Sequence, residues 1–197
     1  MTAAAFLVLL ATTGALALQS ASTTTALDNG TVRVARVRIA QGGAFDMRAD
    51  QAPILMVTMP RGDVQMMRAG MTQRLTNADP APLEIIAITI KPSRRPAEPA
   101  TPASPPPGIT RTTVLETHDV RVVRATFARN GREPVHTHPN DLLTIQITAG
   151  RVEIFDGSDT AIRSQSAGTV HFLPRNVPHA YASADSKPFE ILSIAIK

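Results

Sequence analysis

Apolar and polar residues alternate in short runs along most of the chain after residue 28. Clear examples are Val120-Arg121-Val122, the segment from Leu142 to Ile147, and the segment from Phe189 to Ile196. A period of two with β-branched residues is typical of half-buried strands. The runs end at turn signals such as Asn130-Gly131 and Asp156-Gly157. No sustained helical period follows residue 28, so the pattern predicts an all-β sandwich or barrel.

The alternating pattern occurs twice. Adding 88 to Val32, Val34 and Arg36 gives Val120, Val122 and Arg124, and the same shift places Gly62 on Gly150. At the far ends a shift of 106 is needed, which aligns Glu84 with Glu190 and Ile90 with Ile196, for example. Internal repeats of this kind predict two copies of one supersecondary unit.

The first copy is shorter than the second. Aligning Ala69-Gly70 with Ala167-Gly168 at a shift of 98 predicts ten missing residues before that point and eight after it (98 − 88 and 106 − 98). The second gap would remove the segment equivalent to the one around His179. The shift of 88 places Arg48 and Asp50 opposite His136 and His138. These two charges either pair with each other or are simply solvated.

Segment boundaries follow from composition. Residues 1–22 resemble a signal peptide with cleavage near Ala17–Ser22, since an uncharged apolar run precedes small residues. Its apolar run is short for a membrane span, and we expect no membrane association after its removal. Residues 29–91 then form the first β unit, the Pro-rich residues 92–110 a linker, and residues 111–197 the second unit. The expected location is periplasmic or secreted.

Composition removes several classes of function. The chain has no cysteine and no tryptophan, and Tyr181 is its one tyrosine. Thiolate ligands, cysteine nucleophiles and disulfides are therefore excluded. The net charge is +4, but the arginines are scattered rather than gathered in one block. A nucleic-acid partner is not expected, because such a surface needs clustered basic groups.

Two segments of the second unit carry the chemistry. One runs from Gly131 through His136-Thr-His138-Pro139, and the other runs from Gly168 through Pro174 and Asn176 to His179. They resemble the paired motifs of the cupin superfamily, which are small jelly-roll barrels with a metal inside. The resemblance implies a duplicated, bicupin-like fold with a degenerate first copy and a complete second copy. It also implies pairing of subunits, so a homodimer is expected.

The motifs make His136, His138 and His179 the expected metal ligands. Side chains at i and i+2 of a strand point to the same side, so His136 and His138 face the barrel together. Three neutral imidazoles suit Fe, Mn, Ni, Cu or Zn and leave positions for water or substrate. The resemblance lacks one ligand, because the family's glutamate position is occupied by Leu142 or Leu143, depending on the direction of counting.

Other side chains are expected to line the pocket. Those with the parity of the histidines, or next to them, are Leu142, Thr144, Gln146 and Tyr181. His171 is expected to face outward and His118 to be solvated. No catalytic residue can be assigned from the sequence.

Two functions fit these residues. One is a mononuclear metalloenzyme, a dioxygenase or an isomerase acting on a small anionic molecule, because three histidines leave the charge of the cation unneutralised. The other is a non-catalytic metal- or ligand-binding module. The cupin fold hosts both, so fold alone does not decide between them.

Overall fold

The described residues form strands, turns and loops, and no helix occurs among them. The structure is a computed structural model that describes residues 20–92, 104–185 and 187–197. Most of the expected signal peptide and most of the Pro-rich linker therefore lie outside the described residues. No helix in the described part of the chain is long and apolar enough to span a membrane.

The first half contributes seven strands. Their bounds are β1 (Ala21–Asp28), β2 (Val32–Ile39), β3 (Ala44–Ala49), β4 (Ile54–Met59), β5 (Asp63–Met67), β6 (Met71–Thr76) and β7 (Leu83–Ile90). Five of them form an antiparallel sheet in the order β1-β2-β7-β4-β5, and β3 pairs with β6 to close the other side of the barrel. β1 thus begins eight residues before the start expected for this unit.

The second half repeats this arrangement with additions. Its strands are β8 (Ile109–Glu116), β9 (Val120–Phe127), β10 (Asp141–Gln146), β11 (Gly150–Phe155), β12 (Thr160–Gln165), β13 (Val170–Leu173), β14 (Ala180–Ser183) and β15 (Phe189–Ile196). The large sheet has the order β13-β10-β15-β9-β8, and the small one the order β12-β11-β14. The predicted all-β cupin-type barrel is confirmed.

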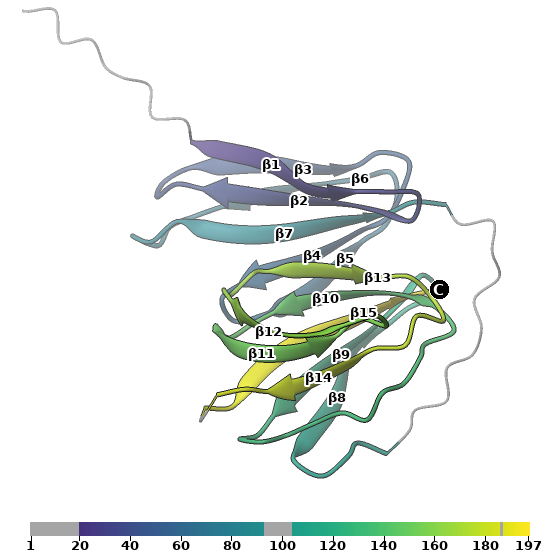
Figure 1. Cartoon of the computed structure of the whole chain (residues 1–197). Coiled ribbons are helices and arrows are strands. Elements are labelled where there is room, and N and C mark those ends of the chain that lie inside the picture. The colour runs from purple at the N-terminus through teal and green to yellow at the C-terminus, as the bar shows by residue number, and fades with distance from the viewer. Residues whose placement is uncertain (1–19, 93–103, 186) are drawn as a thin grey trace, which may run out of the picture.

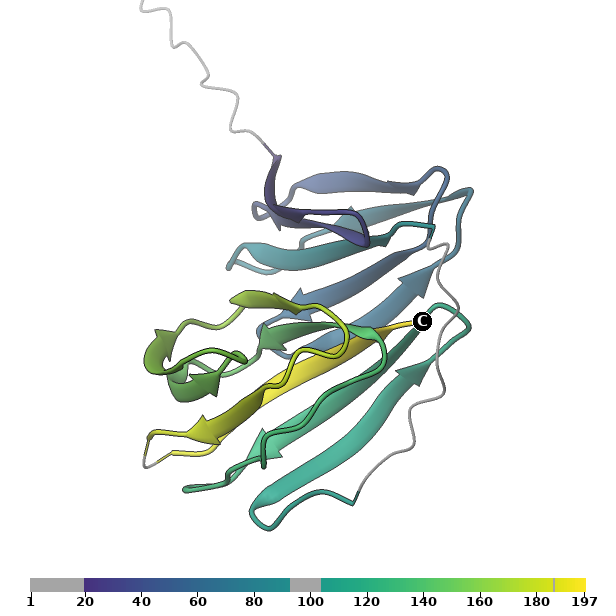
Figure 2. The ribbon, with the colours of Figure 1, turned by 45° about the vertical axis from the view of Figure 1, so that its right-hand side comes forward.

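The two large sheets pack against each other. The first half, which begins in purple, lies above the second half, which runs from teal to yellow, in Figures 1 and 2. The largest core cluster is shared by both halves and is lined by fully buried side chains such as Val34, Leu55, Leu143 and Ile194. Each half also has a smaller core inside its own barrel. Burial of apolar surface between the sheets therefore joins the halves into one body.

Strand bounds and pairing follow the shifts seen in the sequence. Adding 88 to β1 and β2 gives β8 and β9, and adding 106 to β7 gives β15, residue for residue. The pairing of Ile54 with Met67 likewise becomes that of Leu142 with Leu173 (54 + 88 and 67 + 106). β5 is therefore the counterpart of β13. This correspondence is what a duplication predicts.

The expected position of the missing residues is wrong. The shift of 106 already applies at Gly62, which corresponds to Gly168 rather than Gly150; both have a positive φ, 69° and 80°. One block of eighteen residues (106 − 88) is absent from the first half. It corresponds to residues 148–165, which hold the hairpin of β11 and β12. The segment around His179 keeps its counterpart, which is β6.

The paired glycines mark a contact between the halves. Arg36 donates from its guanidinium to Gly168 O at 2.5 Å and to Glu84 at 3.1 Å. Arg124, its counterpart, donates to Gly62 O at 2.7 Å and forms an ion pair with Glu190. Each half thus caps a turn of the other, so the same interaction occurs twice about an approximate twofold axis.

Candidate metal centre

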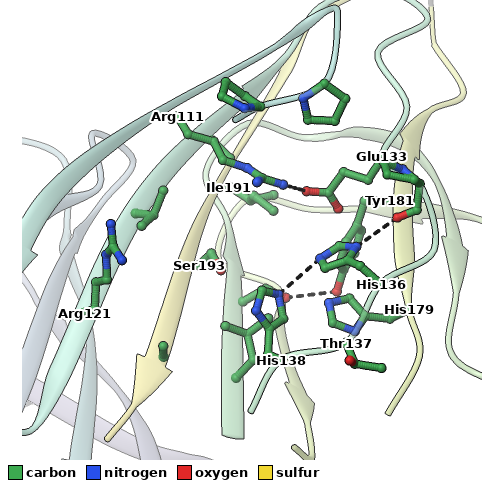
Figure 3. Close-up of a pocket in the computed structure, with 18 of the residues that line it drawn as sticks. Arg111, Arg121, Glu133, His136, Thr137, His138, His179, Tyr181, Ile191 and Ser193 are labelled. Carbon is green, nitrogen blue, oxygen red and sulfur yellow. Dashed lines mark hydrogen bonds and ion pairs between the residues drawn. The ribbon is translucent and has the colours of Figure 1, made fainter. Parts of the chain in front are cut away.

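Three imidazoles converge inside the second barrel (Figure 3). One potential ligand nitrogen from each of His136, His138 and His179 lies within 4.8 Å of the other two. The Nε2 atoms of His136 and His138 are 3.2 Å apart. Two ligands at the usual metal–nitrogen length of about 2.0–2.1 Å would be separated by roughly this much. The donor set and spacing therefore fit a single metal ion.

The backbone holds His136 and His179 side by side. His136 N–H donates to His179 O at 3.0 Å, and His179 N–H donates to His136 O at 2.9 Å. These bonds form an isolated antiparallel bridge between the two motif segments. His138 O accepts from Asn176 N–H at 2.8 Å. Asn176 has φ 61°, a left-handed conformation that asparagine tolerates better than most residues other than glycine.

Main-chain carbonyls also orient two of the rings. Nδ1 of His136 lies 2.9 Å from Pro134 O, and Nδ1 of His179 lies 3.0 Å from Val177 O. Each Nδ1 must carry a proton to donate to a carbonyl, so each neutral ring presents the lone pair of Nε2. Fixing the tautomer and the ring direction in this way is typical of metal-binding histidines.

Burial favours the neutral form of His138 and of His179. It is the main cause that lowers the pKa of His138 to about 4, and the neighbouring rings and Arg111 lower it further. Burial also lowers the pKa of His179, which is only 3% exposed, although the Val177 carbonyl opposes the effect. A neutral imidazole is the form that binds metal.

The histidines border a cavity of about 580 Å³. Leu142, Thr144 and Tyr181 line it, as the sequence predicts. Tyr181 lies 3.2 Å from Thr144 through the two hydroxyl oxygens, and burial raises the pKa of the phenol to about 12. The phenol is therefore neutral at pH 7 and can donate or accept a hydrogen bond.

Gln146 does not line this cavity, contrary to the prediction. It is buried, and its amide donates to Thr148 O at 2.8 Å. The parity argument holds for the strand, but Gln146 is four residues beyond Leu142, which is about 13 Å along β10. That distance takes the amide to the far end of the barrel.

Asp141 and His171 are also placed by the structure. Asp141 accepts from Thr31 Oγ1 at 2.8 Å and from Arg175 N–H at 2.9 Å, so its carboxylate contacts the first half instead of the histidines. His171 is half-buried on the opposite face of β13 from Val170 and Phe172, which pack on the shared core. It therefore faces the barrel, and the expected outward position is wrong. His118 is exposed, as expected.

The cavity contains an ion pair that the sequence reasoning missed. The guanidinium of Arg111, on β8, donates to the carboxylate of Glu133, and both residues line the cavity (Figure 3). Glu133 is only 7% exposed. Its position three residues before His136 is a signal that could have been noticed. Arg111 lies 25 residues before His136, and no motif marks it.

The first barrel offers no such site among its described residues. Its β3–β6 pair places Met47 opposite Gln73, where the second barrel has His136 opposite His179. Gly70 N–H donates to Ala49 O, as Asn176 N–H donates to His138 O. The counterparts of the three histidines are thus Met47, Ala49 and Gln73.

The expected alignment of Arg48 and Asp50 with the two histidines is wrong by one residue. Both side chains are exposed, whereas Met47 and Ala49 are buried. One extra residue between Arg132 and His136 shifts the second half, and a one-residue shift turns a strand's side chains to the other face. Among the described ion pairs none joins Arg48 and Asp50, in agreement with the solvated alternative.

Comparison with known proteins agrees on the fold. No protein-family model matches the sequence, and no curated protein does. Solved structures do match over most of the chain. Salicylate 1,2-dioxygenase from Pseudaminobacter salicylatoxidans has a TM-score of 0.67 at 10% identity, covering 90% of this chain and 76% of its own. A putative glyoxylate-induced protein from Pseudomonas aeruginosa has 0.66 at 16%, covering 90% and 81%.

A third similar structure is named after the cupin fold. The cupin 2 conserved barrel domain protein from Leptotrichia buccalis has a TM-score of 0.54 at 14% identity, covering 91% of this chain and 90% of its own. The chain therefore has the cupin fold, with a three-histidine group in its second barrel that can hold a metal ion.

Proposed function

We propose that the chain is an exported metalloprotein that binds one divalent transition metal through His136, His138 and His179. The proposal is supported by the convergence of three imidazoles from two distant segments. In His136 and His179, a main-chain carbonyl binds Nδ1 and so directs the lone pair of Nε2 toward the ion. Fe, Mn, Ni, Cu and Zn all accept such ligands, so the ion's identity is left to measurement.

We further propose that the centre acts as a metal-dependent dioxygenase or isomerase on a small anionic molecule. Three histidines and no carboxylate ligand leave the charge of the ion available to attract an anion. The cavity of about 580 Å³ is within the range usual for small-molecule sites. Two of the similar solved structures are of a salicylate 1,2-dioxygenase, and one of these two contains adducts with gentisate. This similarity supports a small acid as substrate.

The bound ion would supply Lewis acidity and, if redox-active, electrons for oxygen chemistry. The protein's own part is to exclude water and orient the substrate. Leu142 and Ile191 give the cavity an apolar wall, and the Tyr181 hydroxyl beside Thr144 offers a neutral hydrogen bond near the histidines. Export rests on the expected signal peptide of residues 1–22.

Metal analysis tests the proposal. The mature protein, reconstituted with Fe(II), Mn or Ni and dialysed without chelator, should retain about one equivalent of one of these ions. The double variant His136→Ala/His138→Ala should retain none, and His118→Ala, which removes an exposed histidine, should behave as wild type. Equal metal content in the wild type and the double variant would overturn the proposal. Mass spectrometry of the secreted or periplasmic protein would show whether the chain begins after Ala17.

A further inference from the structure

The ion pair of Arg111 and Glu133 gives the metal cavity a second polar end. Glu133 is buried and the Arg111 side chain is mostly buried, with a relative exposure of 28%. Figure 3 shows the pair above the three imidazoles, with Glu133 toward Tyr181. A guanidinium carries five N–H donors, and Glu133 is the one hydrogen-bond acceptor that the described residues give Arg111. As far as the described residues go, further donors of Arg111 remain for a ligand.

The wall of the cavity beside these two ends is mainly apolar. Strands β9, β10 and β15 contribute Val123, Ala125, Leu142, Ile191 and Ala195 to it, and Thr144 and Ser193 are the polar side chains among them. Such a wall binds a hydrocarbon body and offers few hydrogen-bond partners to a highly hydroxylated molecule. A ligand that fills the cavity is expected to be apolar in the middle and polar where it meets Arg111.

The repeat distinguishes the two arginines that line the cavity. Arg121 also lines the cavity, but its contacts are structural. It donates to Thr113 at 3.3 Å and pairs with Glu116 at 3.2 Å. In the first half, its counterpart Arg33 contacts Thr25 and Asp28 in the same way.

Arg33 makes those contacts in a half without the three histidines, so they serve the sheet rather than a site. Arg111 and Glu133 have no such counterpart. A shift of 88 places Thr23 and Phe45 at their positions. The pair therefore occurs only in the barrel with the histidines.

We propose that Arg111 binds the carboxylate of a small organic acid with a hydrocarbon body, held between this guanidinium and the three histidines. The inference rests on the proposed function and gives its anionic substrate a class. Glu133 pairs with Arg111 in the free protein, and its negative charge repels the carboxylate of a ligand that binds the remaining donors. An arginine–carboxylate pair away from bulk water is among the stronger hydrogen-bonded contacts.

Benzoate and its neutral analogue benzamide test whether Arg111 is such a carboxylate anchor. The full-length mature protein is used in zinc-loaded and in metal-free form. Isothermal titration should give a benzoate Kd that Arg111→Gln raises at least tenfold in both forms, whereas benzamide binding changes less than threefold. Arg132→Gln is the matched control. It removes a positive charge next to Glu133 in sequence, but Arg132 pairs with Glu153 and does not line the cavity.

The other partner of the pair should act in the opposite direction. Glu133→Gln removes the repelling charge, so benzoate should bind at least threefold more tightly than to wild type. A loss of structure cannot give opposite effects from the two partners. If Arg111→Gln does not fold, Glu133→Gln decides, and unchanged or weaker benzoate binding would then overturn the anchor.

The outcomes separate the anchor from the metal centre. Equal benzoate affinity in Arg111→Gln and Arg132→Gln, or no binding of benzoate to wild type at millimolar concentrations, overturns the anchor whatever the metal content. Benzoate binding that depends on Arg111 in a protein that retains no metal supports the anchor and overturns the proposed metal centre.

Discussion

The two barrels of this chain share a frame but differ inside. Both have a five-stranded sheet of the same order, and Arg36 and Arg124 make equivalent contacts across the interface. Inside the first barrel, Met47 and Ala49 are packed among other apolar side chains. Inside the second, His136 and His138 border a cavity. The contacts that hold the halves together recur in both, and those that make a site occur in one.

The difference shows what each barrel contributes. A cavity lined by imidazoles and an ion pair lacks close-packed apolar contacts, and such contacts are a main source of stability. The first barrel fills the equivalent space with Met47, Met56 and Met67, whose flexible side chains adapt to irregular gaps. It also presents a complete sheet to the shared core. The first half therefore supports the second, and the site occupies only one side of the body.

Copying the first barrel's residue into the second should have the largest effect. His179→Gln replaces the ring by the residue found at Gln73, its counterpart. An amide is a poor ligand for a transition metal, and even loss of an outer partner costs about 10–100-fold in affinity. We expect the metal Kd to rise by more than about 100-fold, measured by competition with a chromophoric chelator.

A substitution at the matching position of the first barrel serves as the control for His179→Gln. Gln73→Ala alters the matching position of the first barrel and should leave metal affinity unchanged. Equal metal affinity of wild type and His179→Gln would show that His179 is not a ligand.

The shared core tests whether the halves unfold together. Leu55 and Leu143 are counterparts (55 + 88), and both are fully buried in the cluster that spans the interface. Leu55→Ala and Leu143→Ala should each lower the free energy of unfolding by about 2–5 kcal/mol, the usual cost of such a cavity. Each variant should retain a single transition in urea. Two separate transitions, with each variant shifting only one, would show that the halves are independent.

Much of this architecture can be predicted from the sequence, because strands and turns are local. The alternation from Phe189 to Ile196 gives β15 with its observed bounds. The three histidines are also predictable, since two short motifs fix their spacing. In the structure His136 and His179 meet in an isolated bridge, and His138 lies outside the strands. Local chemistry is sufficient where a pattern repeats every two residues.

The errors come from information that is not local. Where the eighteen missing residues lie depends on which strands pair, and the similar glycines of the turns allowed Gly62 to be matched with Gly150. A single added residue near Pro134 reversed the parity that placed Arg48 opposite His136. The pair of Arg111 and Glu133 is brought together by tertiary packing across 22 residues of chain, which no short motif records.

The two interface arginines should have matching, smaller effects. Arg36→Gln and Arg124→Gln each remove a charged hydrogen bond to a carbonyl of the other half, at Gly168 and Gly62. We expect each to lower the free energy of unfolding by about 1–2 kcal/mol, since both side chains are partly exposed. Arg48→Gln, at an exposed arginine of the first half, should change it by less than about 0.5 kcal/mol. A loss of stability in only one of the two variants, Arg36→Gln or Arg124→Gln, would contradict the approximate symmetry.

The last effect depends on pH and concerns protonation, where only the second barrel has buried imidazoles. Burial lowers the pKa of His138 to about 4, whereas an unfolded histidine has a pKa of about 6.5. Between these values the unfolded chain binds a proton that the folded, metal-free protein does not. The free energy of unfolding is therefore unaffected by this proton above about pH 6.5, and it decreases as the pH falls from about 6.5 to about 4.

Comparison of variants isolates this contribution from that of the carboxylates. The difference in unfolding free energy between metal-free wild type and His138→Gln should fall over that pH interval and be constant above it. His118→Gln, at an exposed ring, should show no such trend. A difference that does not change with pH would mean that His138 is not held in its neutral form. In the metal-loaded protein the same interval should show a steeper loss, because protons then also compete with the ion for all three rings.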